Sequence, residues 1–392
     1  MELNALLQRA VDLEASDIHL KVGRPPAVRR DGEIVTLEVP PLTDDDLDAI
    51  LRTVTAAAPK RYDQFQETGD LDIAYTSGSL PRFRVNAFRQ RGAVSFALRV
   101  IPATVPTFEA LGLPEGVGRL AEEHRGLILV TGATGSGKTT TLASIIDYIN
   151  RTRRSHIVTV EDPIEIMHGD QLSIVNQREI GLDTESFGQA LRRALRQDPD
   201  TILIGELRDA ETAQTALQAA ESGHLVFSTL HTIDAAETVG RMIEFFPPAK
   251  QQQIRSILAG VLRGVISQRL LPRTGGGRVA AVELMITNAR IADLIRENKP
   301  EEITDAIAEG EFSKMQTFAK ALIEHVLSGE VDREVAANAS TNRHDFMVAL
   351  EYAEKAQAAG IDHAAPAAAA PEPEPEPAPE PEFELRLAPL GD

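Results

Sequence analysis

The sequence predicts an α/β protein in which a smaller α+β domain precedes a larger domain built on a parallel sheet. From residue 126 onward, short apolar runs alternate with amphipathic helical stretches, and a glycine-rich loop separates the first run from the next helix. Residues 1–100 show a different pattern, with two-residue alternation over part of their length. The chain has 392 residues, enough for two to three domains of about 150 residues each.

Residues 1–100 are assigned to the smaller α+β domain. Alternating polar and apolar side chains predict two strands within the range Arg82–Val100, with Gly92 at the turn between them. A helix is predicted near the N-terminus because apolar residues recur there at helical spacing, at Leu3, Leu6, Leu7, Ala10 and Val11.

The larger domain is assigned to residues 116–355, after a linker at residues 101–115. A helix at Ala210–Ser222 is predicted because Asp209 is a good N-cap and Gly223 favours a helix end. The apolar runs predict buried parallel strands with helices on both faces, at Leu127–Val130, Ile157–Val160, Ile202–Ile204 and Leu225–Leu230.

Residues 356–392 are predicted to form a disordered tail. From Pro366 the chain consists mainly of Ala, Pro and Glu, and residues 371–376 alternate Pro with Glu. Repeated proline blocks helix and sheet, and the tail has little apolar surface to offset the entropy of ordering. The alternative for its last apolar segment, Phe383–Leu387, is a docking peptide.

The composition excludes several functional classes. The chain has no cysteine, so it has no disulfide, thiolate zinc site or cysteine nucleophile. A net charge of −19 and an aromatic content of 4% argue against a nucleic-acid partner. No apolar stretch approaches the roughly 20 residues that span a bilayer, and no signal-peptide pattern opens the chain. We therefore expect a cytoplasmic protein without an integral membrane segment.

Residues 132–139 match the phosphate-binding pattern G-x-x-x-x-G-K-[ST] in full. A predicted strand precedes them and an amphipathic helix follows, so that backbone N–H groups and the helix N-terminus can bind phosphate. We expect ATP and Mg²⁺ as ligands, with Lys138 at the β- and γ-phosphates and the Thr139 hydroxyl at the metal. The expected nucleotide-binding residues are Gly132, Ala133, Thr134, Gly135, Ser136, Gly137, Lys138, Thr139 and Thr140.

Acidic residues follow two further predicted strands, whose carboxyl ends should meet beside this loop. Glu161 and Asp162 follow the second strand, and Glu206 follows the third. Gly205 stands where such a third strand usually carries an aspartate. Glu206 is therefore expected to activate the attacking water, with Glu161 as the alternative base. Asp162 or Glu161 would complete the metal site with Thr139.

Two histidines flank the fourth strand. At about 3.3 Å per residue, His224 and His231 lie about 20 Å apart on a straight strand. Geometry therefore favours His231, at the carboxyl end, as the residue that reaches the nucleotide. His224 is equally well explained as a strand-edge or interface residue.

These motifs together resemble the bacterial secretion ATPases of the type II secretion and type IV pilus class, and most closely the PilT-type retraction ATPases of twitching motility. The resemblance covers roughly residues 1–350 and implies a RecA-like ATPase domain, a PAS-like N-terminal domain and assembly as a homohexamer. The matching segments are Ala15–Leu20, Gly23–Gly32, Gly132–Thr141, Ile157–His168, Ile202–Thr212 and Ala220–Thr232.

The resemblance also implies roles for particular residues. Both His224 and His231 would be functional, and arginine fingers of the N-terminal domain would reach the nucleotide of a neighbouring subunit. Arg82 and Arg84 are the first choices because they share one strand face, and an arginine supplied in trans stabilises transition-state charge. The alternative is a solvated strand face. Further candidates are Arg89, Arg91 and Arg99.

As a whole, the resemblance implies a hexameric motor that hydrolyses ATP to retract pili. It would be peripheral at the inner face of the cell membrane, where it would meet the platform protein of the pilus. Residues 290–297 keep five of the eight residues of the family segment Ala-Ile-Arg-Asn-Leu-Ile-Arg-Glu. This departure leaves an accessory retraction paralogue open. The sequence also leaves room for a pilus-assembly or type II secretion ATPase, a RecA-type nucleic-acid motor or a non-hydrolysing regulator.

Overall fold

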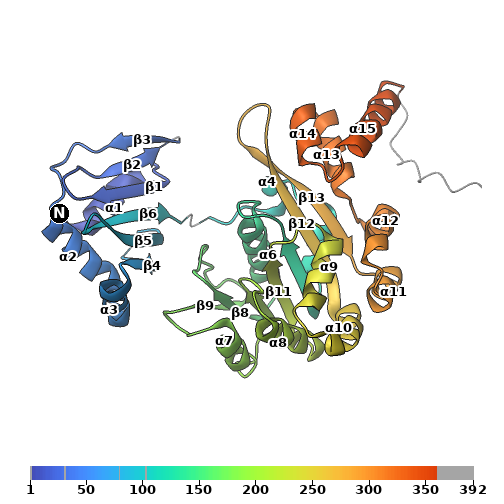
Figure 1. The fold of residues 1–392 in the computed structure, drawn as a ribbon, viewed down its shortest axis with the longest axis horizontal. Helices are drawn as coiled ribbons and strands as arrows, with labels where there is room; N and C mark the ends of the chain where they lie inside the picture. The colour runs from blue at the N-terminus through green and yellow to red at the C-terminus, as the bar shows by residue number, and fades with distance from the viewer. Residues whose placement is uncertain (1, 31, 79, 102–103, 360–392) are drawn as a thin grey trace, which may run out of the picture.

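The computed structural model describes residues 2–30, 32–78, 80–101 and 104–359, which form two domains with separate sheets (Figure 1). The predicted tail from Pro366 onward lies outside the described residues. Helix α15 (Arg343–Ala358) extends three residues beyond the start assigned to that tail.

The N-terminal domain is an antiparallel six-stranded sheet in the order β3-β2-β1-β6-β5-β4, covered by three helices. The two predicted strands are β5 and β6, and Gly92 turns between them with a φ of 82°. The elements are α1 (Leu3–Asp12), β1 (Asp17–Lys21), β2 (Ala27–Arg30), β3 (Glu33–Thr36), α2 (Asp44–Thr55), α3 (Pro59–Thr68), β4 (Asp70–Tyr75), β5 (Phe83–Gln90) and β6 (Ala93–Val100). The α+β prediction is confirmed, and the PAS-like comparison stays a prediction.

The second domain contains a seven-stranded sheet in the order β13-β12-β7-β11-β10-β8-β9. All neighbouring strands are parallel except β12 and β13. The strands are β7 (Gly126–Thr131), β8 (His156–Glu161), β9 (Ile174–Glu179), β10 (Thr201–Ile204), β11 (Leu225–Leu230), β12 (Leu262–Pro272) and β13 (Arg278–Ile286). The four predicted strands are β7, β8, β10 and β11, so the parallel-sheet prediction is confirmed; β9, β12 and β13 extend the sheet at its two edges.

Helices cover both faces of this sheet, which explains the continuous apolar runs of its inner strands. Leu127 and Leu129 of β7 pack in one buried cluster, and Ile128 and Val130 pack in another on the opposite face. The helices are α4 (Phe108–Leu111), α5 (Glu115–Ala121), α6 (Lys138–Thr152), α7 (Phe187–Ala194), α8 (Ala210–Glu221), α9 (Ala235–Glu244) and α10 (Pro248–Val261). Asp209 caps α8 by accepting from Thr212 N at 2.8 Å, as predicted.

The chain ends in a helical region beside β12 and β13 (Figure 1). Its elements are α11 (Ala289–Glu297), η1 (Pro300–Glu302), α12 (Ile303–Ala308), η2 (Glu311–Ser313), α13 (Phe318–Leu327), α14 (Arg333–Ala339) and α15. On α11 the predicted apolar stripe of Ile291, Leu294 and Ile295 is buried. Arg296 and Glu297 remain exposed at the end of the same helix.

Candidate active site

The glycine-rich loop connects β7 to α6, the arrangement that the phosphate-binding motif requires. Gly132 has a φ of 140°, and a Cβ there would collide with the carbonyl oxygen of Gln268 and lie 2.6 Å from Ser136 Oγ. Gly137 is the N-cap of α6 with a φ of 93°. Both positions need glycine, because an L side chain would be strained or would displace the loop. The first turn of α6 therefore presents its free N–H groups to the space above the loop.

Lys138, the first residue of α6, folds back over this loop. Its Nζ donates to the carbonyl oxygen of Gly132 at 2.7 Å and to that of Ala133 at 3.0 Å. Burial lowers the pKa of the Lys138 ammonium, and the carboxylates of Glu206 and Glu165 act in the opposite direction. The ammonium thus lies at the phosphate loop with two carboxylates in electrostatic range.

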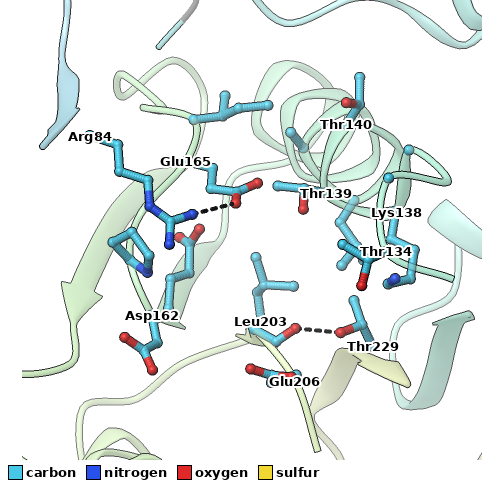
Figure 2. A pocket seen from close by; sticks show the side chains of 18 of the residues that line it. Arg84, Thr134, Lys138, Thr139, Thr140, Asp162, Glu165, Leu203, Glu206 and Thr229 are labelled. Atoms are coloured by element: carbon cyan, nitrogen blue, oxygen red, sulfur yellow. Dashed lines mark hydrogen bonds and ion pairs between the residues drawn. The ribbon is translucent and has the colours of Figure 1, made fainter. Parts of the chain in front are cut away.

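A cavity of about 580 Å³ opens above the loop (Figure 2). Of the nine expected nucleotide-binding residues, six line it: Thr134, Gly135, Gly137, Lys138, Thr139 and Thr140. The other three build the loop. Gly132 and Ala133 supply the carbonyls that bind the lysine, and Ser136 is buried.

Glu206 follows β10 and lines the cavity. Its carboxylate has two side-chain neighbours: Oε1 pairs with Arg208, and Oε2 lies 3.5 Å from His231 Nε2. Arg208 Nη1 also lies 3.6 Å from Asp162 Oδ2. The pairing of β10 with β11 places Glu206 and His231 together, because the two parallel strands end at the same edge. The predicted positions of Glu206, His231 and Asp162 at this cavity agree with the structure.

Glu161, the last residue of β8, is buried at the same cavity wall. Thr159 Oγ1 donates to Glu161 Oε1 at 2.6 Å, and Gln177 Nε2 donates to the same oxygen at 3.1 Å. Burial raises the pKa of this carboxyl, whereas the two donors act to lower it. Both donors contact the same oxygen, Oε1.

The cavity offers oxygen donors that suit Mg²⁺. Thr139, Asp162 and Glu161 all line it, and hydroxyl and carboxylate oxygens are the ligands that this ion prefers. Within the described residues, no group of three or more His, Cys, Asp or Glu side chains could hold a metal ion alone. Mg²⁺ typically binds through one or two carboxylates together with substrate phosphates, so this sparse donor set fits it.

Two arginines of the N-terminal domain line the cavity from the other side. Arg84 on β5 and Arg99 on β6 are direct cross-strand partners, and like charges in that relationship repel. Arg99 Nε donates to Asp17 Oδ1 at 2.9 Å, and Arg84 Nη1 lies 3.7 Å from Glu165 Oε1. Figure 2 shows Arg84 and Glu165 facing each other across from Thr139 and Lys138. A polyphosphate in the cavity would offset the repulsion between the arginines.

These two arginines belong to the same chain as the phosphate loop. The guanidinium of Arg82 does not line the cavity of its own chain and forms a buried ion pair with Glu179, so its role as a finger toward a neighbouring subunit stays a prediction. Arg89 points elsewhere, since it donates to Gln66 Oε1 at 2.8 Å within its own domain.

The structure does not bring His224 to this cavity, and its functional role stays a prediction. It precedes β11, whereas His231 follows the same strand. At about 3.3 Å per residue, β11 holds the two side chains at opposite ends of the strand. His224 Nδ1 instead lies 3.0 Å from the Ala219 carbonyl oxygen and 3.0 Å from Ser222 Oγ.

Several residues of the cavity wall were not predicted. Glu165 and His168 belong to the acidic segment after β8, and only their place in that segment could have suggested them. Burial lowers the pKa of His168. Arg278 lies at the start of β13, a strand that was not predicted, so no motif pointed to it.

The fold and the cavity define the chain as a P-loop ATPase, because a phosphate loop and a carboxylate able to activate water meet at the carboxyl edge of one parallel sheet. Residues 1–276 match the family model described as "Type II/IV secretion system protein". The chain belongs to this family.

Individual relatives support the same assignment. The chain is 45% identical over 336 residues to a type IV pilus retraction ATPase of Pseudomonas aeruginosa, PilT, covering 86% of this chain and 97% of the relative. It is 37% identical over 359 residues to a second type IV pilus ATPase of that organism, PilU, covering 91% and 94%. A crystal structure of the pilus retraction motor PilT with bound ADP superposes with a TM-score of 0.81 at 48% identity, covering 88% of this chain and 98% of that one.

Among the described residues, no helix combines the length and the apolar character needed to cross a bilayer.

Proposed function

We propose that this ATPase is a motor that hydrolyses ATP to retract type IV pili. The observation that carries the proposal is the 45% identity to a pilus retraction ATPase over 336 residues, 86% of this chain. We further propose that it works as a homohexamer in the cytoplasm. There it would be peripheral at the inner face of the cell membrane, on the platform protein of the pilus.

Different residues of the cavity have different roles in hydrolysis. Lys138 and the N–H groups at the start of α6 bind the phosphates, so that nucleotide binding depends on the loop. Glu206 orients and deprotonates the attacking water, and His231 holds the Glu206 carboxylate from the neighbouring strand. Arg84 and Arg99 neutralise the charge that develops on the transferred phosphoryl group. Thr139 and Asp162 would hold Mg²⁺, which would supply further neutralisation of phosphate charge.

Force transmission is assigned to a different part of the chain. Arg296 and Glu297 are exposed on α11, whose apolar stripe is buried against the rest of the domain. Neither residue lines the cavity. This exposed end of α11 would contact a neighbouring subunit or the pilus machinery.

The second candidate is an accessory retraction ATPase that works beside a principal motor. Its support is the departure from the retraction segment at residues 290–297. An assembly or secretion ATPase is disfavoured, because the chain lacks the cysteines of the zinc insert that those proteins usually carry.

A deletion strain complemented with the wild-type chain or with Lys138→Ala tests the proposal. Loss of retraction should leave excess surface pili, which wild type removes and Lys138→Ala does not. Lys250→Ala, an exposed lysine on α10, is the matched control and should complement fully. Normal retraction in the deletion strain, despite ATPase activity of the purified protein, would contradict the motor and favour the accessory role.

A further inference from the structure

We propose that Arg82 and Glu179 form a clamp between the two domains that positions Arg84 and Arg99 over the nucleotide cavity. Arg82 is then a positioning residue, which acts on the nucleotide through its neighbours in the sheet. This inference rests on the proposed role of the cavity as the site of ATP hydrolysis.

The clamp is a buried ion pair between residues of different domains. Arg82 immediately precedes β5 of the N-terminal domain, and Glu179 ends β9, the edge strand of the second sheet. Their side chains retain only 11% and 5% of their exposure, respectively. Strand β9 lies on the side of its domain that faces the N-terminal domain (Figure 1). Exclusion of water makes this attraction stronger than that of a surface ion pair.

On one side, the clamp is rigidly connected to the two arginines of the cavity. Arg82 accepts a hydrogen bond at its carbonyl oxygen from Ile101 N at 2.8 Å, where the chain leaves the N-terminal domain. Arg84 lies two residues further along, and its register partner on β6 is Arg99. A movement of Arg82 relative to the second domain therefore carries both cavity arginines with it.

On the other side, the clamp is connected to the acidic wall of the cavity. Glu179 Oε2, the oxygen that pairs with Arg82, also accepts from Ile164 N at 3.2 Å. The neighbours of Ile164 in the chain are Pro163 and Glu165, which both line the cavity. One carboxylate oxygen thus holds the arginine of one domain and the cavity wall of the other.

Other contacts between the domains are weaker. Arg84 lies 3.7 Å from Glu165, but their side chains are 40% and 43% exposed, and exposed pairs contribute little. The guanidinium of Arg61 on α3 lies against Gly181, where a side chain would collide with it. Among these contacts, the buried pair of Arg82 and Glu179 is therefore the strongest interaction that fixes the relative position of the two domains.

We expect the clamp to have two states: Arg82 and Glu179 are paired in the closed state and separated in the open state. Removing one partner leaves the other charge buried without compensation, which proteins avoid by opening the contact to water. In the open arrangement Arg84 and Arg99 leave the cavity, while Lys138 and the phosphate loop stay unchanged within their own domain. Loss of the clamp should therefore lower kcat more than it weakens nucleotide binding.

Turnover measurements in two backgrounds test whether Arg82 acts through the cavity arginines. Arg82→Ala should lower kcat by about 10- to 100-fold, the range expected for a misplaced catalytic group, and leave the Kd of a non-hydrolysable ATP analogue within about threefold. Arg82→Lys, which keeps the charge, should recover part of the loss. In an Arg84→Ala, Arg99→Ala background, adding Arg82→Ala should lower kcat by less than about twofold. A role in stability alone would reduce activity equally in both backgrounds.

Matched variants guard against general damage to the fold. Glu179→Gln retains an acceptor for Ile164 N and removes only the charge, so it carries the test if Arg82→Ala fails to fold. Arg89→Ala removes an arginine of β5 that donates within its own domain. This variant should retain kcat within about twofold.

A measurement of the distance between the two domains tests the clamp directly. The chain has no cysteine, so spin labels can be placed uniquely at Glu33→Cys and Gln197→Cys, both exposed and in different domains. Labelled subunits diluted with unlabelled ones should give one narrow interdomain distance in the wild type. Arg82→Ala and Glu179→Gln should broaden or lengthen it, and Arg82→Lys should restore it.

The outcomes separate this inference from the proposed function. A wild-type protein without ATPase activity would contradict the proposed function before any variant is compared. With an active wild type, an unchanged distance and a kcat within about twofold in Arg82→Ala and Glu179→Gln would overturn the clamp alone. An additive loss in the Arg84→Ala, Arg99→Ala background would also overturn it.

Discussion

His231 Nε2 lies 3.5 Å from Glu206 Oε2, at the carboxyl ends of the neighbouring parallel strands β11 and β10. The contact joins the side chain expected to activate water to an imidazole from a different strand. Glu206 lies two residues beyond the end of β10 and His231 one residue beyond the end of β11, so the pairing of the two strands brings the segments that carry them together. The other oxygen of the carboxylate pairs with Arg208, so both oxygens have a side-chain partner.

Replacing the proposed base should separate binding from turnover. Glu206→Gln keeps the shape of the side chain but cannot accept the proton of water, so kcat should fall by about 10²- to 10⁴-fold. The Kd for ATP should remain close to that of the wild type, because the phosphate loop is untouched. Single-turnover kinetics and equilibrium binding of a fluorescent ATP analogue measure the two effects. A kcat near the wild-type value would shift the base assignment to Glu161.

Removal of metal ions should distinguish two kinds of site. EDTA should abolish ATP turnover and added Mg²⁺ should restore it, because the cavity offers only a few oxygen donors for an ion shared with phosphate. A zinc-selective chelator should leave the melting temperature within about 1 °C, since the chain has no cysteine for a thiolate cluster. Scanning calorimetry with each chelator checks this, and a clear fall with the zinc chelator would contradict it.

Stability should depend on pH through Glu283 of β13. Burial raises the pKa of this carboxyl to about 7, although Ala235 N donates to its Oε1 at 2.9 Å. The folded state therefore holds a proton that the unfolded state releases near pH 4.5. The stabilisation linked to this proton is present below about pH 4.5 and is lost as the pH rises through about 7, up to about 3 kcal/mol in total.

Glu283→Gln tests this linkage, because the amide stays neutral and can still accept from Ala235. The variant should match the wild type in unfolding free energy near pH 4, below the unfolded pKa, and exceed it by up to about 3 kcal/mol at pH 8. Denaturant unfolding across this range at fixed protein concentration provides the measurement. A wild-type minus variant difference that is flat with pH would show that Glu283 does not titrate in this range.

Hydrolysis and force transmission should be separable on α11. Arg296→Ala combined with Glu297→Ala should keep ATPase activity within about twofold, because neither residue lines the cavity. Pilus retraction in cells should nevertheless be impaired. Arg290→Ala on the same helix, whose guanidinium pairs with Glu309, is the control and should leave retraction unchanged. Complete loss of hydrolysis in a folded double variant would place this segment in the active site instead.

The predictable part of the fold is the part that is buried on both faces. Strands β7, β8, β10 and β11 read as continuous apolar runs because helices cover both sides of them. The edge strand β9 was missed because it is only partly buried, with Ile174 exposed. Strand β12 was missed because it carries buried polar side chains, such as Ser267, which accepts from Thr131 Oγ1 at 2.9 Å.

The same division applies to the site. Glu206, Asp162 and His231 could be predicted because the ends of parallel strands converge, whatever the loops do. The ion pair of Arg82 could not be predicted, because its partner, Glu179, lies on a strand that the sequence did not reveal. His224 was included on the strength of the resemblance, although the length of β11 separates it from the cavity.

The contacts of Lys138 have a consequence for the nucleotide cycle. Its ammonium donates to two carbonyl oxygens of its own loop, so an incoming phosphate competes with acceptors that are already in place. Binding is then an exchange of acceptors around one cation, and departure of the product is the reverse exchange. Because the loop carbonyls can accept from Lys138 again, product release never leaves its half-buried ammonium without a partner. A motor must release ADP in every cycle. Such an exchange returns Lys138 to its starting contacts faster than tighter nucleotide binding would.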